Sequence, residues 1–357
     1  MQQILNGIHN LYQIMEQVHF RKPMLVTDAS FPFLSIKNQI EGITLPKALF
    51  NNFTPNPLQE QVDQGAEQFL KEDCDALIAV GGGSCIDVAK CIKLTCLEHR
   101  DTIPLIAIPT TAGTGSESTH NAVVYLNGVK QTVTDDRILP DVAILEPSVL
   151  KTLPLYQKKC TMMDALCQGI ESWWSLNSTD ESKGYSKTAV ETIMTHWERY
   201  IFDNDEDAAE KIMSAANFSG KAINLAQTTA AHAMSYKITS LYKLPHGHAV
   251  AVCLPEIWDY MLKHPEHCID PRGYDYVTRV FHQIAGSMGK GQPTEAIQQF
   301  RKMMSMMGLE RPHSTSERDS ELELLSQSVN PVRLKNNPIQ LEKDAILELY
   351  RTIVEIS

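Results

Sequence analysis

The chain has 357 residues, of which 43% are hydrophobic and 21% charged, a composition ordinary for a globular protein with room for two domains. Its formal net charge of −11 argues against nucleic acid or an anionic membrane as the main partner, although local basic groups still permit a small anionic substrate. No apolar run reaches the roughly 18 residues of a membrane-spanning helix, and residues 1–13 lack the basic segment and apolar core of a signal peptide.

The first 150 residues alternate strand and helix patterns. Short apolar runs predict buried strands at 23–28, 75–80 and 105–108. Helices are predicted at 57–71 and at 86–94. In the first of these, Pro57 marks the start of the helix and apolar residues recur along one face. Strands separated by helices pair in parallel, so this part is predicted to be a Rossmann-like α/β domain.

After Pro154 the strand patterns nearly vanish. Amphipathic stretches predict helices at 162–176, 187–200, 208–225, 276–288 and 342–354. The polar segment 310–338 is predicted to form surface loops and short helices. We therefore expect a dinucleotide-binding α/β domain over 1–153, an all-α metal-binding and catalytic domain over 154–357, and a ligand cleft between them.

A glycine turn, Gly81-Gly82-Gly83-Ser84, lies between a predicted strand and a predicted helix. Glycines allow a pyrophosphate to approach the backbone, and the first amides of the helix point at its charge. The alternative is a plain tight turn. Thr110, Thr111 and Thr114 follow the next strand and are predicted to form a second wall of the cofactor groove, unless these hydroxyls only satisfy their own loop.

Asp28 ends the first strand, where a dinucleotide fold places the adenosine ribose. Its carboxylate accepts hydrogen bonds from the ribose hydroxyls of NAD and repels the 2′-phosphate of NADP. The sequence therefore predicts a preference for NADH over NADPH. The alternative is an aspartate that caps a turn.

One carboxylate and two imidazoles in the second half, Asp164, His232 and His246, form a candidate metal site. This donor set suits Zn²⁺ or Fe²⁺ and leaves a position open for substrate. With twelve histidines in the chain, such a group also arises by chance. The dinucleotide-binding pattern of the first half is what favours the metal site.

The eight cysteines are scattered, form no Cys-x-x-Cys pair and lie partly in apolar stretches. This pattern predicts buried, reduced thiols in a cytoplasmic protein.

Together these motifs resemble the iron-activated, group III alcohol dehydrogenase family, which shares its fold with glycerol dehydrogenase and dehydroquinate synthase. The resemblance covers nearly the whole chain and is carried by Asn56-Pro57, the glycine turn with Asp87, the segment from Pro109 to Glu117, Pro140-Asp141, Asp164-Ala165-Leu166 and Pro245-His246-Gly247. It implies NAD(P)-linked conversion of an alcohol/aldehyde pair at one divalent metal, with Asp164, His232 and His246 as ligands. The cofactor-binding residues it implies are Asp28, Asn56, Gly82, Gly83, Ser84, Asp87, Thr110, Thr111, Thr114, Ser116, Val123 and Lys130.

Two positions depart from the family pattern. The family usually has a fourth ligand, a histidine, where this chain has Gln168, and an amide oxygen is a poor partner for a transition metal beside imidazole. Many members have another histidine where this chain has Tyr236. Tyr236 is therefore expected to donate a hydrogen bond or relay a proton, with a plain core tyrosine as the alternative. Lys130 is the second catalytic candidate.

The segments around Asp164, His232 and His246 also resemble the phosphonoacetaldehyde reductase subgroup. This resemblance implies reduction of phosphonoacetaldehyde to 2-hydroxyethylphosphonate. A phosphonate dianion needs cations or oriented amides. Substrate-binding candidates are Lys237, His248, Lys130 and Gln168, and the alternative for the charged ones is a solvated surface group.

Other functions remain open at this stage. They are a general alcohol, aldehyde or polyol dehydrogenase of the same family, a lyase of the dehydroquinate synthase type, and a non-catalytic binder that has lost its metal. The choice between Fe²⁺ and Zn²⁺ also stays open. The small-molecule partner is expected to be an aldehyde, and the chain is expected to form a homodimer.

Overall fold

The computed structural model describes residues 2–314 and 317–356, and these form two compact units. The first unit comprises the described residues up to Pro154 together with Phe202–Gly220, and the second comprises Leu155–Ile201 and the described residues from Lys221 onward. The predicted fold class, a Rossmann-like α/β part followed by a helical part, is confirmed. The division into domains after residue 153 stays a prediction.

The first unit is built on a parallel sheet, with the strand order β3-β2-β4-β5-β8-β1. Every residue of β2, β4, β5 and β8 is buried, as expected for a parallel sheet with both faces covered. The strands are β1 (Gln3–Asn6), β2 (Pro23–Thr27), β3 (Ala48–Phe50), β4 (Ala76–Gly81), β5 (Leu105–Pro109) and β8 (Val142–Leu145).

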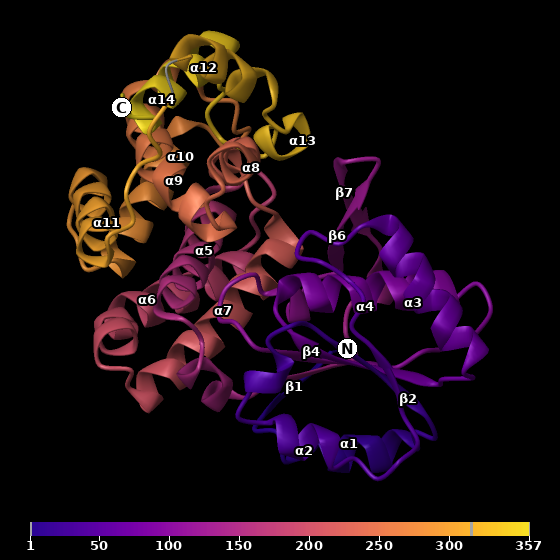
Figure 1. The fold of residues 1–357 in the computed structure, drawn as a ribbon. Helices are drawn as coiled ribbons and strands as arrows, with labels where there is room; N and C mark the ends of the chain where they lie inside the picture. Colours follow the sequence, from indigo (N-terminus) through magenta and orange to yellow (C-terminus); the bar gives the residue numbers. More distant parts are fainter. Residues whose placement is uncertain (1, 315–316, 357) are drawn as a thin grey trace. The chain divides into compact units, whose positions relative to one another are not determined.

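Helices cover both faces of this sheet, with α1 and α2 below it and α3 and α4 above it in Figure 1. Val62 and Phe69 of α3 pack into one apolar cluster with Ile86 and Ile92 of α4. The helices of this unit are α1 (Asn10–Val18), α2 (Lys37–Glu41), α3 (Gln59–Lys71) and α4 (Gly83–Cys96), with short 3-10 turns η1 (Phe31–Phe33), η2 (Ser116–Ser118), η3 (Asp136–Ile138) and η4 (Pro147–Lys151).

An antiparallel hairpin, β6 (Asn121–Leu126) and β7 (Val129–Thr134), also belongs to the first unit. Its two turn residues, Asn127 and Gly128, both have positive φ, which is the conformation that a tight two-residue hairpin turn requires.

Helix α7 (Glu206–Ala226) begins in the first unit and ends in the second. In the first unit its Asn217 donates hydrogen bonds to Glu117 Oε1 at 2.9 Å and to Ser118 Oγ at 2.7 Å. Its Gly220 touches Gly115 backbone to backbone, since a Cβ on Gly220 would lie 2.6 Å from the Gly115 carbonyl oxygen. This part of α7 therefore holds the loop that follows β5.

The strand order reverses direction between β2 and β4. From β2 the chain adds β3 on one side, and from β4 it adds β5 and β8 on the other. Ligands of open α/β sheets bind at the carboxyl ends of strands at such a switch point. Asp28 follows β2 and Gly82 follows β4, so both residues lie at this position.

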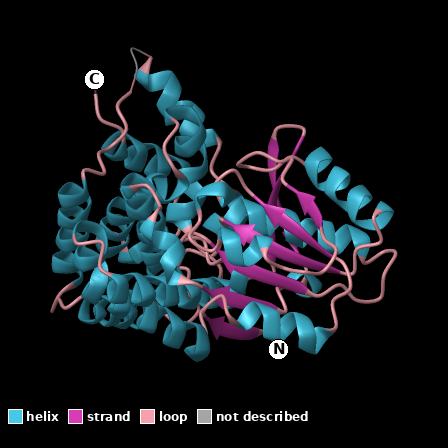
Figure 2. Ribbon diagram, turned by 60° about the horizontal axis from the view of Figure 1, so that its bottom comes forward, coloured by secondary structure: helices cyan, strands magenta, loops and turns pink. Residues whose placement is uncertain are grey.

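The second unit consists of packed helices, which are drawn in cyan in Figure 2. Helix α9 packs against both α5 and α8. The rings of Trp174, Trp258 and Phe281 pack against one another inside this unit, with centroids 5.5 to 6.2 Å apart. Its elements are α5 (Leu155–Trp174), α6 (Asp180–Phe202), α8 (Ala230–Tyr242), α9 (His246–Lys263), η5 (Pro265–His267), α10 (Tyr274–Ser287), α11 (Pro293–Met307), α12 (Arg318–Gln327), α13 (Pro331–Leu334) and α14 (Lys343–Ile353).

Across residues 2–314 and 317–356, no helix is both long enough and apolar enough to cross a bilayer. All eight cysteines are free thiols, and seven of them are buried.

Candidate metal centre and cofactor turn

Three helices of the second unit bring Asp164, His232 and His246 together. Asp164 lies in α5, His232 in the first turn of α8, and His246 is the first residue of α9. Their ligand atoms lie within 4.8 Å of one another, and Asp164 Oδ1 is 3.3 Å from His232 Nε2. Two ligands at 2.0–2.1 Å from one tetrahedral ion are about 3.3 Å apart, so this pair already has the separation that a shared metal requires.

The polar atoms of this cluster also favour a bound cation. Asp164 Oδ1 and His232 Nε2 are buried, and neither makes a hydrogen bond of normal geometry with another described residue. Buried polar atoms without partners are costly, and in native proteins they are normally satisfied by a protein group, water or an ion. A divalent metal between these atoms would satisfy both, so the residues fit the group that the sequence predicts.

The charges of the cluster are strongly coupled. Burial alone would raise the pKa of Asp164, but His232 and His246 outweigh it and lower that pKa below its ordinary value. Burial alone would lower the pKa of His232, but the Glu171 and Asp164 carboxylates outweigh it and raise the pKa to about 9. The site therefore attracts positive charge strongly.

Glu171, two turns after Asp164 on α5, fixes the orientation of His232. Its Oε2 accepts a hydrogen bond from His232 Nδ1. Its Oε1 accepts from the Thr229 and Ala231 amides, both at 3.0 Å, and from the Thr229 hydroxyl at 2.9 Å. Because an ionised carboxylate only accepts, Nδ1 carries the proton in the neutral imidazole that a metal binds, and Nε2 then directs its lone pair toward Asp164.

Gly247 allows α9 to approach α5. A Cβ at this position would lie 2.0 Å from the Cys160 carbonyl oxygen and 2.8 Å from Asp164 Cβ. Any larger residue would push the start of α9 away from α5 and carry His246 away from Asp164. The glycine after His246 is therefore a geometric requirement of the cluster.

Gln168, the residue at the fourth-ligand position, lies one turn after Asp164 on α5 and is buried. Its side chain helps to lower the pKa of the Asp164 carboxyl group. Gln168 thus influences the charge of a predicted ligand.

Tyr236 and Arg333 extend the cluster on one side. The Tyr236 ring stacks on the His246 ring, with centroids 5.8 Å apart and planes inclined by 22°. The positive charge of Arg333 acts on the Tyr236 hydroxyl and works to lower its pKa, from a helix, α13, that packs on α8. Arg333 was not among the predicted site residues, because it lies about a hundred residues after Tyr236 in a polar segment that carries no motif.

The other predicted substrate residues of this unit have different surroundings. Both ring nitrogens of His248 are bonded, one to the Tyr156 hydroxyl at 2.9 Å and the other to the Glu310 carbonyl oxygen at 2.8 Å. These bonds tie α9 to α5 and to the segment that follows α11. Lys237 follows Tyr236 on α8 and is partly exposed.

At the sheet's switch point, Asp28 holds the glycine turn. Asp28 Oδ2 accepts a hydrogen bond from the Gly82 amide at 3.0 Å, and its Oδ1 accepts from the Ser30 amide at 2.9 Å. The hydrogen bonds inside α4 begin with the amides of Cys85 and Ile86. The amides of Gly83 and Ser84 precede them, at the end of the helix that favours an anion.

The threonine loop packs directly on this turn. A Cβ on Gly83 would lie 2.7 Å from Thr114 Oγ1, and one on Gly82 would lie 3.6 Å from the Thr111 methyl group. Thr110 is buried, and its amide bonds the Gly81 carbonyl oxygen at 3.0 Å. The two loops thus form one continuous surface at the carboxyl ends of β4 and β5.

A buried polar network lies behind this surface. Asp87 accepts hydrogen bonds from the Ser116 hydroxyl and, at 2.9 Å, from the Val123 amide. Lys90 donates to Ser116 Oγ at 2.9 Å and to Thr119 Oγ1 at 3.0 Å. Burial lowers the pKa of Lys90 to about 8. The side chains of Asp87 and Ser116 therefore tie α4 to the threonine loop and the hairpin.

The last two predicted cofactor residues lie at the edges of the first unit. Asn56 is exposed, has a left-handed backbone with φ of 60° and precedes Pro57. Lys130 pairs in register with Tyr125 in the hairpin, and its charge acts on Asp87.

Two family models together match most of the chain. The model for iron-containing alcohol dehydrogenases matches residues 2–147, and the model for the C-terminal part of the same family matches residues 159–354. The chain belongs to the iron-containing alcohol dehydrogenase family.

Individual relatives agree with this assignment. A phosphonoacetaldehyde reductase of Streptomyces viridochromogenes is 33% identical over 306 residues, which cover 79% of this chain and 76% of the relative. An NAD-dependent methanol dehydrogenase of Bacillus methanolicus is 30% identical over 268 residues, or 70% of each chain. The crystal structure of a sulfoacetaldehyde reductase from Bifidobacterium kashiwanohense in complex with NAD⁺ superimposes with a TM-score of 0.87 at 26% identity, covering 99% of this chain and 96% of that one.

As a member of this family, the chain is an NAD-linked alcohol dehydrogenase that acts on an alcohol/aldehyde pair. The iron-containing alcohol dehydrogenase assignment also favours an enzyme over the non-catalytic binder and the lyase that the sequence left open.

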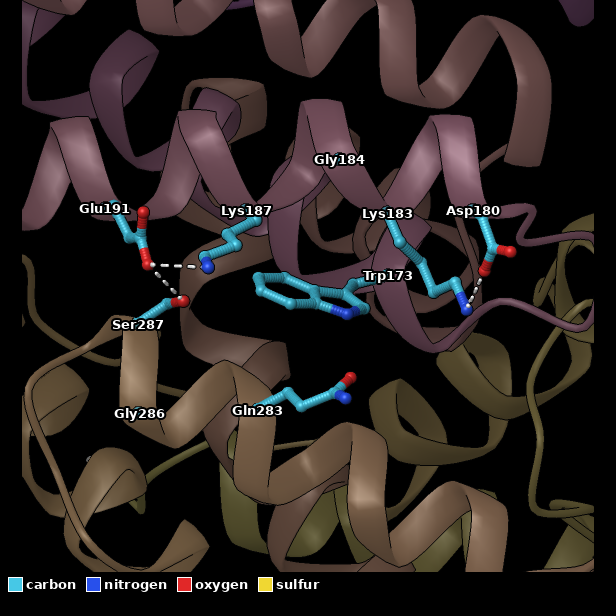
Figure 3. A pocket seen from close by; sticks show the side chains of 9 residues that line it. All are labelled: Trp173, Asp180, Lys183, Gly184, Lys187, Glu191, Gln283, Gly286 and Ser287. Atoms are coloured by element: carbon cyan, nitrogen blue, oxygen red, sulfur yellow. Dashed lines mark hydrogen bonds and ion pairs between the residues drawn. The ribbon is translucent and has the colours of Figure 1, made fainter.

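The second unit also has a pocket away from the metal cluster. Figure 3 shows the Trp173 indole between side chains of α6 and Gln283 of α10. Lys183 pairs with Asp180 at 2.8 Å, and Lys187 pairs with Glu191 at 3.8 Å. This pocket contains none of the predicted site residues, so we assign the candidate site of this unit to the cluster around Asp164.

Proposed function

We propose that this enzyme reduces a short aldehyde that bears a phosphonate group, phosphonoacetaldehyde, to the primary alcohol with NADH. Two relatives support the substrate class, since one is named a phosphonoacetaldehyde reductase and the other a sulfoacetaldehyde reductase. Both named substrates carry a tetrahedral oxyanion on the carbon next to the aldehyde. The shared chemistry is recognition of an anion a short distance from a reacting carbonyl.

The observation that carries the proposal is the cation beside the metal cluster. Arg333 is partly buried, and its positive charge acts on the hydroxyl of Tyr236, whose ring stacks on His246. Its backbone is fixed because Asn330 Oδ1 accepts hydrogen bonds from the Val332 amide at 2.9 Å and the Arg333 amide at 3.1 Å. A planar guanidinium binds two oxygens of a phosphonate at once, which favours Arg333 over Lys237 as the anion partner.

Asp164, His232 and His246 would hold the divalent metal, Fe²⁺ or Zn²⁺, and Glu171 would keep His232 Nε2 directed at it. When bound, the metal supplies Lewis-acid polarisation of the carbonyl and NADH supplies the hydride. Burial raises the pKa of Tyr236, so its hydroxyl stays protonated at neutral pH and can donate to the substrate oxygen.

For the cofactor, we propose that Asp28 selects NADH. Its carboxylate lies on the glycine turn, at the switch point of the sheet. A 2′-phosphate near this group would be repelled, whereas ribose hydroxyls would donate to it. Replacement of Asp28 by glycine is expected to narrow the preference for NADH, mainly by improving the KM for NADPH. A wild-type enzyme that prefers NADPH would contradict this assignment.

The substrate assignment is tested with Arg333→Ala and an aldehyde panel. We expect wild-type kcat/KM to be far higher for phosphonoacetaldehyde than for propanal. Loss of one partner of a charge pair should lower the phosphonoacetaldehyde value by roughly 100-fold or more, with little change for propanal. Lys335→Ala, which removes an exposed cation from the same segment, serves as the matched control.

The methanol dehydrogenase relative favours a second candidate, a general short-chain alcohol dehydrogenase. Similar wild-type kcat/KM values for phosphonoacetaldehyde and propanal would establish that function in place of the phosphonate-specific one.

A further inference from the structure

A second group of metal-ligating side chains lies where α9 ends. His264, Glu266 and His267 offer two imidazole nitrogens and a carboxylate oxygen within 4.8 Å of one another. His264 Nδ1 lies 2.9 Å from Glu266 Oε1, and His267 Nε2 lies 3.5 Å from the same oxygen. The side chains are 38%, 59% and 39% exposed, respectively. A solvent ion therefore has direct access to all three.

The backbone that carries these side chains is fixed on both sides. Pro265 opens the 3-10 turn η5, and the His267 amide bonds the His264 carbonyl oxygen at 3.2 Å. The His267 carbonyl oxygen accepts from the Gln340 amide at 2.9 Å, and Cys268 forms a β-bridge with Ile339. The three ligands are thus held on one tight turn, which lowers the entropy that binding would cost.

One ring is fixed as well. Tyr260, one turn earlier on α9, stacks on His264 with ring centroids 4.1 Å apart and planes inclined by 26°. The charge of a second carboxylate, Glu342, acts on the same tyrosine together with Glu266. Glu342 thus adds a second carboxylate charge near the cluster, which favours a cation.

The ligand separations match those of a bound transition metal. Ligands at 2.0–2.1 Å from one tetrahedral ion lie about 3.3 Å apart, between the 2.9 and 3.5 Å measured here. We propose that His264, Glu266 and His267 form a second divalent-metal site for Zn²⁺ or a chemically similar transition metal. Two imidazoles and one carboxylate select such ions over Ca²⁺ and Mg²⁺, which prefer all-oxygen sites.

This site is separate from the cluster around Asp164. His246 begins α9 and His264 caps its end, so the helix alone separates the two groups by about 27 Å. No ligand of one site reaches the other, and each is expected to fill independently. A filled second site would clamp the end of α9 to the turn that follows it.

The test is the zinc content of the full-length enzyme after removal of metal and equilibrium dialysis against Zn²⁺. The wild type is expected to bind two equivalents, whereas His267→Gln and His264→Gln should each bind one. His246→Ala should also retain one equivalent, held by the second site. His282→Ala, which removes an exposed histidine from α10, is the matched control and should bind two.

Thermal unfolding with and without Zn²⁺ gives a second readout. In the His246→Ala background, Zn²⁺ should still raise Tm, and the added His267→Gln change should abolish that rise. His264 and His267 variants that bind as much zinc as the wild type would overturn the proposal. Neither readout depends on the aldehyde substrate.

Discussion

Replacement of Glu171 by glutamine should weaken metal binding without unfolding the enzyme. The side chains have nearly the same shape, and a glutamine oxygen in the place of Oε1 would keep accepting from the Thr229 and Ala231 amides, both at 3.0 Å. The amide NH₂ then faces His232 Nδ1 and can only donate to it. The imidazole proton must therefore move to Nε2, the atom that lies 3.3 Å from Asp164 Oδ1.

A proton on Nε2 occupies the lone pair that a metal needs. The opposite amide orientation keeps the tautomer but points NH₂ at the N–H donors of α8, which is also unfavourable. Changes of this kind in groups that orient a ligand typically cost 10–100-fold in metal affinity, or about 1.4–2.7 kcal/mol. We expect this loss for Zn²⁺ in competition with a chelator, together with a changed His232 tautomer in ¹⁵N NMR spectra.

The control is Thr229→Ala, which removes the hydroxyl that donates to Glu171 Oε1 at 2.9 Å and accepts from Trp174 Nε1. This variant should lower the free energy of unfolding but leave the His232 tautomer and the zinc affinity nearly unchanged. Zinc affinity in Glu171→Gln equal to that of the wild type would refute the argument that Glu171 sets the tautomer.

Three further predictions concern Gly247, the residues of the Asp164 cluster, and two buried cysteines. Gly247→Ala should abolish metal binding at the Asp164 cluster by separating α9 from α5, so the folded variant should lose one equivalent of metal relative to the wild type; a variant with the full metal content would contradict the packing argument. His246→Ala should lose nearly all activity, whereas Gln168→Ala should keep a substantial part, as measured by kcat; equal losses would make Gln168 a ligand. Burial raises the pKa of Cys91 and Cys160 to about 12 from 9.0, so above pH 9 the unfolded chain releases protons that the folded chain keeps. The free energy of unfolding should therefore fall from pH 8 to 10, by up to about 1.4 kcal/mol per pH unit for each thiol, and Cys91→Ala should flatten this slope in urea titrations.

The cofactor half of the fold was largely predictable from the sequence because its signals are local. Fully buried parallel strands appear as continuous apolar runs, and the predicted strands at 23–28, 75–80 and 105–108 correspond to β2, β4 and β5. The strands β1, β3 and β8 were missed, because each has only three or four residues, too few for a pattern to emerge.

The second half was less predictable because its determining contacts are distant. Helix α9 was not predicted, and Pro255 interrupts its pattern. Glu171 lies inside a motif, yet it can orient His232 only because α8 begins directly against α5. The spacing of these residues in the sequence does not reveal that contact. Arg333 lies beside Tyr236 only in the folded structure, because several helices separate the two residues in the sequence. The grouping of Asp164, His232 and His246 was predictable from residue chemistry and the family resemblance.

Helix α7 also limits how this enzyme can be divided or recombined. The chain passes between its two units three times, after residues 154, 201 and 220, so no single cut separates them. A fragment that ends at Pro154 would lack the Asn217 amide that bonds Glu117 and Ser118, and the glycine that seats against Gly115. A chimaera with a relative would therefore have to exchange residues 202–220 together with the first 154. A single crossover point cannot do this, because it would separate two segments that pack together.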